Sequence, residues 1–86
     1  MRLQYHSKFQ KQLHKLPIER QLAVKERLIL FEQKPFIAIL NNHALKGRYE
    51  GYRSINITGD MRAIFIVLDK NRVEFVYIGS HSQLYS

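Results

Sequence analysis

The stretch His43–Phe65 reads HALKGRYEGYRSINITGDMRAIF, and it decides the expected fold because it contains two strands and the turn between them. Residues 52–57 alternate polar and apolar side chains, which is the pattern of a half-buried strand. Thr58-Gly59-Asp60 then predicts a tight turn. Ser54 and Asn56 point away from the two isoleucines of the strand, so we expect them on an open face of the sheet.

The strands that follow extend this hairpin into an antiparallel meander. Met61–Leu68 is apolar on both faces apart from Arg62, as expected for a central strand. A second turn precedes Arg72–Ile78, which predicts a further strand. One face of that strand carries three apolar or aromatic residues, Val73, Phe75 and Tyr77.

The N-terminal half predicts one strand and a helical hairpin. Residues 2–6 alternate as a short strand, and Ser7 is the expected N-cap of a first helix. That helix has an apolar stripe at Phe9, Leu13 and Leu16. Pro17 ends it and can begin a second helix, which runs to about Lys34 before Pro35.

Together these elements predict an α+β fold in two layers, formed by a single domain over residues 1–86. Phe36–Leu40 is expected to form a turn or short helix under the sheet, and Gly79 to end the last strand before a polar tail, Ser80–Ser86. The helical hairpin should cover one face of the sheet. The other face would then remain open as a shallow cleft.

Composition narrows the possible functions. The 86 residues include no cysteine, which excludes a disulfide framework and a thiolate metal site. The formal net charge is +7, which favours a nucleic acid or an acidic protein as partner. Seven scattered carboxylates argue against a two-metal nuclease. We identify neither a signal peptide nor an apolar run long enough to span a membrane.

Basic and aromatic residues interleave in the central stretch. Tyr49 and Tyr52 lie among four cations, Lys46, Arg48, Arg53 and Arg62. Cations bind phosphates and aromatic rings stack on bases, so this pattern suits RNA. The alternative is a hairpin with a polar outer face and no ligand.

The order of elements resembles that of the RelE/ParE superfamily of bacterial toxins. Within it, His43-Ala-Leu-Lys-Gly, Gly51-Tyr-Arg53, Gly59-Asp60 and the ending Gly79-Ser-His-Ser-Gln-Leu-Tyr85 are similar to the YafQ-type messenger-RNA interferases. The motifs cover the C-terminal half. The resemblance implies a RelE-like fold and an endoribonuclease that cuts messenger RNA on the translating ribosome.

The resemblance also implies roles for individual residues. His43, Asp60 and His81 match catalytic positions, and Tyr85 matches an aromatic near the scissile nucleotides. Arg62 resembles an arginine that contacts the reacting phosphate. The chain departs from the family pattern in one respect: Asn56 replaces a histidine. An amide accepts no proton at neutral pH, so only a hydrogen-bonding role could survive there.

Metal-free RNA cleavage needs a base for the ribose 2′-OH, donors for the phosphorane and an acid for the departing 5′-oxygen. Histidine suits both proton transfers, and the arginine fork suits phosphate oxygens. We therefore expect His81 as general acid, with His43 or Asp60 as the base or as the group that orients it. Arg53 and Arg62 would stabilise the phosphate, with Lys46, Arg48 and Asn56 binding RNA nearby.

Other interpretations remain open at this point. His43 could cap a turn, Asp60 could be only a turn residue, and Tyr85 could merely anchor the C-terminus. A ParE-like toxin that inhibits DNA gyrase would share the fold without the RNA chemistry. A non-catalytic module that binds RNA or the ribosome would use the same charges and aromatics.

The expected partners follow from the resemblance. They are a cognate antitoxin and messenger RNA on the 70S ribosome, in the bacterial cytoplasm. We expect a monomeric free toxin, a hetero-oligomer with the antitoxin, and neither a cofactor nor a metal.

Overall fold

The fold is a five-stranded sheet with a pair of helices against one face. The structure is a computed structural model that describes residues 1–85; Ser86, the end of the expected tail, lies outside them. The strands are β1 (Arg2–Tyr5), β2 (His43–Ala44), β3 (Arg53–Asn56), β4 (Met61–Asp69) and β5 (Arg72–Ser80). The helices are α1 (Ser7–His14), α2 (Ile18–Gln33) and α3 (His81–Tyr85), with short 3-10 helices at Ala38–Leu40 and Gly47–Tyr49.

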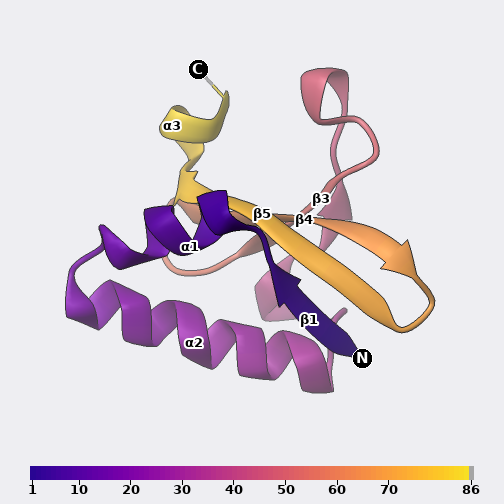
Figure 1. Cartoon of the computed structure of the whole chain (residues 1–86), viewed down its shortest axis with the longest axis horizontal. Coiled ribbons are helices and arrows are strands. Elements are labelled where there is room, and N and C mark those ends of the chain that lie inside the picture. The colour runs from indigo at the N-terminus through magenta and orange to yellow at the C-terminus, as the bar shows by residue number, and fades with distance from the viewer. Residues whose placement is uncertain (86) are drawn as a thin grey trace.

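The sheet is mixed, with the strand order β1-β5-β4-β3-β2. β1 pairs with β5 in parallel, and all other neighbours are antiparallel. Helices α1 and α2 lie on one side of the sheet, whereas α3 and the loop between β2 and β3 rise from the other side (Figure 1). The predicted α+β order of strand, helical hairpin and meander is confirmed.

Local signals place the helical hairpin as predicted, except at its first residue. Pro17 is the N-cap of α2, where a missing N–H costs the helix no hydrogen bond, and α2 ends shortly before Pro35. The N-cap of α1 is His6 rather than Ser7, because Nδ1 of His6 accepts a hydrogen bond from the backbone N–H of Lys8 at 3.0 Å. Within residues 1–85, no helix combines the length and the apolar character needed to cross a bilayer.

The core lies between the helical hairpin and the sheet, and four phenylalanines dominate it. The ring centroid of Phe75 lies 5.7 Å from that of Phe9, 5.4 Å from Phe31 and 5.1 Å from Phe65. All four side chains are at most 1% exposed. The 3-10 helix at Ala38–Leu40 adds the buried Leu40 below the sheet, as the apolar run predicts.

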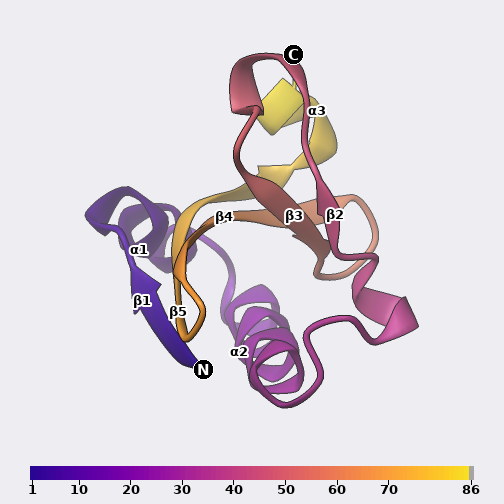
Figure 2. The same ribbon diagram turned by 90° about the vertical axis from the view of Figure 1, so that its right-hand side faces the viewer.

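The opposite face is not the open cleft that the alternation predicts. Ser54 and Ile64, which are paired across β3 and β4, are both 0% exposed. The loop between β2 and β3 and helix α3 stand together over this face (Figure 2). Tyr49 from this loop contacts Tyr77 of β5 and Tyr85 of α3, so the middle of this face is covered.

Tyr77 lies on the face of β5 opposite to the predicted one, because the strand contains a β-bulge. Ile64 pairs with Tyr77, but the next residue, Phe65, pairs with Phe75, which leaves Val76 without a partner. An extra residue in one strand shifts the alternation of its side chains. Tyr77 therefore shares the face of Ile64, not the core face of Phe75.

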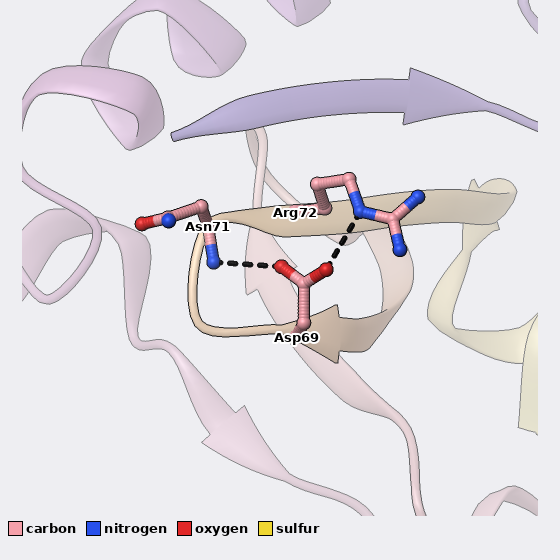
Figure 3. A network of polar contacts seen from close by, with 3 residues as sticks. All are labelled: Asp69, Asn71 and Arg72. Carbon is pink, nitrogen blue, oxygen red and sulfur yellow. Dashed lines mark hydrogen bonds and ion pairs between the residues drawn. The ribbon is translucent and has the colours of Figure 1, made fainter.

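A salt bridge closes the tip of the β4–β5 hairpin (Figure 3). The Asp69 carboxylate accepts hydrogen bonds from Nε of Arg72 at 2.7 Å and from the backbone N–H of Asn71 at 2.8 Å. These bonds, above all the one from Arg72, hold the pKa of Asp69 below its ordinary value of 3.8. Because the folded-state pKa is the lower one, the stabilisation is fully present above pH 3.8 and is lost as the pH falls through that pKa.

We expect an NMR titration of the Asp69 carboxyl carbon to show this depressed midpoint. An Arg72→Gln protein should move the midpoint back toward 3.8, because the charged donor is gone. Equal midpoints in the two proteins would show that the ion pair is not formed in solution.

Candidate active site

Helix α3 brings the C-terminal histidine to the turn between β3 and β4. The backbone N–H of His81 donates to the carbonyl oxygen of Asp60 at 2.8 Å. That turn forms as predicted, with a hydrogen bond from the N–H of Met61 to the oxygen of Thr58 at 2.8 Å and a left-handed Gly59 at φ +53°. Two of the expected catalytic residues are thus adjacent through their backbones.

Arg62 lies beside this junction. In the register of the sheet it is flanked by Asn56 in β3 and Gly79 in β5. Its Nη1 donates to the carbonyl oxygens of Gly59 at 2.9 Å and Met61 at 3.2 Å. Those carbonyls are the polar partners that an arginine in an apolar strand requires. Nε and Nη2 form no hydrogen bond within residues 1–85, so they can point to an anion.

Asn56 and Ser54 carry polar atoms that lack partners. Oδ1 of Asn56 and Oγ of Ser54 are buried, and neither has a hydrogen-bond partner among the described residues. Buried polar atoms without partners are uncommon in proteins, and they occur at sites that a ligand or water completes. Asn56 therefore offers an acceptor on the face that carries Arg62.

His43 lies on the same face, at the edge of the sheet. It pairs with Ser54, and directly paired residues share a face. Its Nδ1 lies 2.8 Å from the carbonyl oxygen of Asn41. A carbonyl can only accept, so Nδ1 carries the proton and Nε2 of the neutral ring keeps a free lone pair. The exposed imidazole could therefore accept a proton at Nε2.

Four tyrosines form a continuous cluster above this face. The ring of Tyr49 lies 6.3 Å from Tyr52, 5.7 Å from Tyr77 and 5.6 Å from Tyr85, measured between centroids. The His81 ring lies 4.7 Å from Tyr85 and joins the cluster at its C-terminal end. Although His81 lies in a polar tail, its ring therefore packs against an aromatic side chain.

The four predicted RNA-binding residues are not brought together. Arg48 donates from Nη2 to the carbonyl oxygen of Leu84 at 2.6 Å, and its guanidinium lies 5.2 Å from the Tyr49 ring centroid. Lys46 is exposed at the start of the same loop. Arg48 therefore borders the tyrosine cluster.

Arg53 is separated from them, because it pairs with Phe65 and so belongs to the helix-covered face. Its Nε donates to Oδ1 of Asn42 at 2.8 Å, and its guanidinium lies over the Phe36 ring at 5.6 Å. Its side chain is held at the sheet edge, away from Arg62. The sequence pattern indicates the face of Arg53, because alternate residues of a strand share a face and Arg53 is in phase with Ile55 and Ile57.

The sequence interpretation missed one contributor to the site and two elements that build it. Tyr77 enters the cluster only because of the bulge. The two-residue strand β2, which carries His43, and the helix α3, which carries His81, were not predicted. Among residues 1–85, no three His, Asp or Glu side chains are grouped so that they could hold a metal ion.

The family follows from comparison with known proteins. The model of the family described as "Bacterial toxin of type II toxin-antitoxin system, YafQ" matches residues 1–86. The crystal structure of YafQ from E. coli strain BL21(DE3) is 22% identical, with a TM-score of 0.81 over 99% of this chain and 98% of that one. A search of curated proteins finds no match.

Two further solved structures are similar over nearly the whole chain. A conserved hypothetical protein from Helicobacter pylori, solved in solution, is 30% identical, with a TM-score of 0.69 over 99% of each chain. The E. coli DinJ–YafQ complex contains a chain that is 20% identical, with a TM-score of 0.70 over 99% of this chain and 98% of that one. The protein belongs to the YafQ family of bacterial toxins of type II toxin–antitoxin systems.

Proposed function

We propose that this toxin is an endoribonuclease that cuts messenger RNA on the translating ribosome by metal-free acid–base catalysis. The observation that carries the proposal is the junction of α3 with the β3–β4 turn, where His81 is bonded to Asp60 at 2.8 Å. Arg62 lies on the strand that leaves this turn, and Tyr85 lies against the His81 ring. An acid, a phosphate-binding cation and a stacking ring thus meet at one margin of the sheet.

The reaction assigns the two proton transfers to different groups. A base, either Nε2 of His43 or the Asp60 carboxylate, takes the proton of a ribose 2′-OH. The 2′-oxygen then bonds to the adjacent phosphorus while the bond from phosphorus to the 5′-oxygen breaks. His81 donates a proton to that departing oxygen. The products are a 2′,3′-cyclic phosphate (or its opened form) and a 5′-hydroxyl.

Two other groups stabilise the reacting phosphate and sugar. The Nε and Nη2 donors of Arg62 would bind the phosphorane oxygens, which carry developing negative charge. The amide group of Asn56, which is beside Arg62 in the register of the sheet, would hydrogen-bond a hydroxyl of the substrate. Asn56 replaces the family's histidine, so this group orients without transferring a proton.

Substrate binding would use charge and stacking together. The net charge of +7 attracts a polyanion, Arg48 borders the tyrosine cluster, and the exposed Lys46 lies two residues before it in the chain. Tyr85 would stack on a base next to the scissile bond, since it lies beside His81. Arg53 is left out of the RNA-binding set because its guanidinium is held on the other face by Asn42 and Phe36.

The cognate partner is an antitoxin that neutralises the toxin in a hetero-oligomer. The E. coli DinJ–YafQ toxin–antitoxin complex contains a chain of similar fold. The strongly basic surface of this chain calls for an acidic antitoxin segment over the active-site face. The free toxin is a monomer that acts in the bacterial cytoplasm, where the ribosomes are.

The products of the reaction test the proposal. Purified toxin is added, with EDTA present, to ribosomes translating a defined message, and the 5′ ends of the fragments are mapped. We expect cuts within codons at the ribosomal A site, with 5′-hydroxyl ends that a kinase can label directly. Fragments with 5′-phosphates would contradict the 2′-OH mechanism. Cleavage that EDTA abolishes would contradict metal-free catalysis, and an intact message would favour gyrase as the target.

A further inference from the structure

Helix α3 has only five residues, His81–Tyr85, yet it carries both the expected general acid and the expected stacking ring. An isolated helix of this length is unstable in water, because nucleation fixes several residues for one hydrogen bond. Contacts at its two ends must therefore hold it in place. Those contacts also decide where His81 lies.

The N-terminal end is closed by a reciprocal pair of hydrogen bonds. Oε1 of Gln83 accepts from the backbone N–H of Ser80 at 2.8 Å. Oγ of Ser80 accepts from the backbone N–H of Gln83 at 3.2 Å. This Ser-x-x-Gln arrangement is a capping box, which satisfies two backbone donors at the start of a helix. His81, the first helical residue, lies inside the box and adds its own N–H bond to Asp60.

Gly79 leaves room for this capping box. A Cβ atom at position 79 would lie 2.9 Å from Oε1 of Gln83, closer than real Cβ contacts. It would also lie 3.6 Å from Cδ2 of Leu84. With a side chain there, Oε1 of Gln83 would have to shift from its present place beside the Ser80 N–H. Gly79, just before the helix, and Gln83, inside it, are therefore both needed for the geometry of the capping box.

The C-terminal end is held by the loop between β2 and β3. The carbonyl oxygen of Leu84 accepts from Nη2 of Arg48 at 2.6 Å and from the hydroxyl of Tyr49 at 2.9 Å. The Leu84 side chain is 5% exposed. These contacts hold the last turn of the helix and involve no residue of its first turn. The first turn, where His81 is, is fixed by the capping box together with the bond from the His81 N–H to Asp60.

We propose that Gln83 is a positioning residue: through the Ser80–Gln83 capping box it holds His81 against Tyr85 and next to Asp60. The catalytic part of this inference rests on the proposed nuclease function, while the geometric part does not. Gln83 is exposed, and its side-chain oxygen is turned back to the backbone. It acts through the backbone of α3 and does not touch the substrate.

The geometric part is tested by the ring-current shift of the His81 imidazole protons. The Tyr85 ring, 4.7 Å away, shifts these protons in the native protein, and a Tyr85→Leu protein supplies the unshifted reference. We expect Gln83→Ala to move the resonances toward that reference. Gln83→Glu should restore them, because a carboxylate keeps the acceptor of the capping box. Gln33→Ala, an exposed glutamine at the end of α2, is the matched control and should leave them unchanged.

The catalytic part is tested by steady-state cleavage kinetics on programmed ribosomes. Gln83→Ala should lower kcat about tenfold with KM changed less than about twofold, since displacement of a catalytic group impairs the chemical step rather than binding. Gln83→Glu should recover most of the loss. Gly79→Ala should reproduce the defect, because its methyl group displaces the same oxygen.

The outcomes separate the two parts. Unchanged His81 shifts in Gln83→Ala would overturn the positioning role, whatever the activity. Changed shifts with full activity would overturn its catalytic importance. The shifts could also change in Gln83→Ala while the native protein itself does not cleave RNA. That result would establish that the capping box holds His81, and it would refute the nuclease function instead.

Discussion

Replacing His81 with alanine should abolish messenger cleavage while leaving the fold intact. A general acid contributes about 100-fold to 10,000-fold to a rate, so we expect kcat to fall at least about 100-fold. The stability cost should be small, because the imidazole is exposed and its ring contact is with Tyr85. Alanine keeps the backbone N–H that bonds to Asp60, and the capping box of α3 is untouched.

The matched control is His14→Ala, which removes an exposed histidine from the end of α1, on the other side of the sheet. Both proteins should show native circular dichroism and ribosome binding, and only His81→Ala should lose cleavage. A His81→Ala protein that cuts at the native rate would remove His81 from the mechanism. Loss of ribosome binding together with cleavage would make it a binding residue rather than the acid.

The parts of the fold that follow from the sequence are those set by local chemistry. Pro17 divides the helical hairpin, and Gly59 adopts the left-handed conformation of the turn before β4. The apolar start of β4 is predictable because its first five residues are largely buried on both faces and need no alternation, whereas Val67 and Leu68 at its far end are exposed. Each of these features depends on a few consecutive residues.

The parts that could not be predicted depend on contacts between distant residues. The bulge that turns Tyr77 to the site face appears only in the register of β4 against β5. Strand β2 is two residues long, too short to leave a pattern. Helix α3 has a local capping box, but its last turn is held by Arg48 and Tyr49, which are far away in the chain. The candidate site is therefore less predictable than the sheet that supports it.

The two faces of the sheet thus have separate roles, one in stability and the other in the candidate site. The helix-covered face contains the phenylalanine core, and the other face carries His43, Asn56, Arg62 and the tyrosine cluster. Because of the bulge at Val76, two residues that would otherwise share a face point to opposite faces of the sheet. Phe75 lies in the core and Tyr77 in the cluster. Substitutions in the core should therefore change stability before they change chemistry.

Phe75→Ala should produce the largest loss of stability in the chain. Its ring contacts Phe9, Phe31 and Phe65, and it is 0% exposed, so alanine leaves a cavity among three other buried rings. A buried phenylalanine truncated to alanine costs about 3–5 kcal/mol. A domain of 86 residues has a total stability of about 4–13 kcal/mol. The substitution should therefore remove a large fraction of it.

Urea unfolding followed by circular dichroism measures this loss, with Phe36→Ala as the matched control. Phe36 is 72% exposed and its ring lies under the Arg53 guanidinium, so its truncation should cost about 0.5–1 kcal/mol. The midpoint should fall far more for Phe75→Ala at a similar m-value, since both chains expose a similar surface on unfolding. Equal losses in the two variants would mean that Phe75 does not hold the helical hairpin to the sheet.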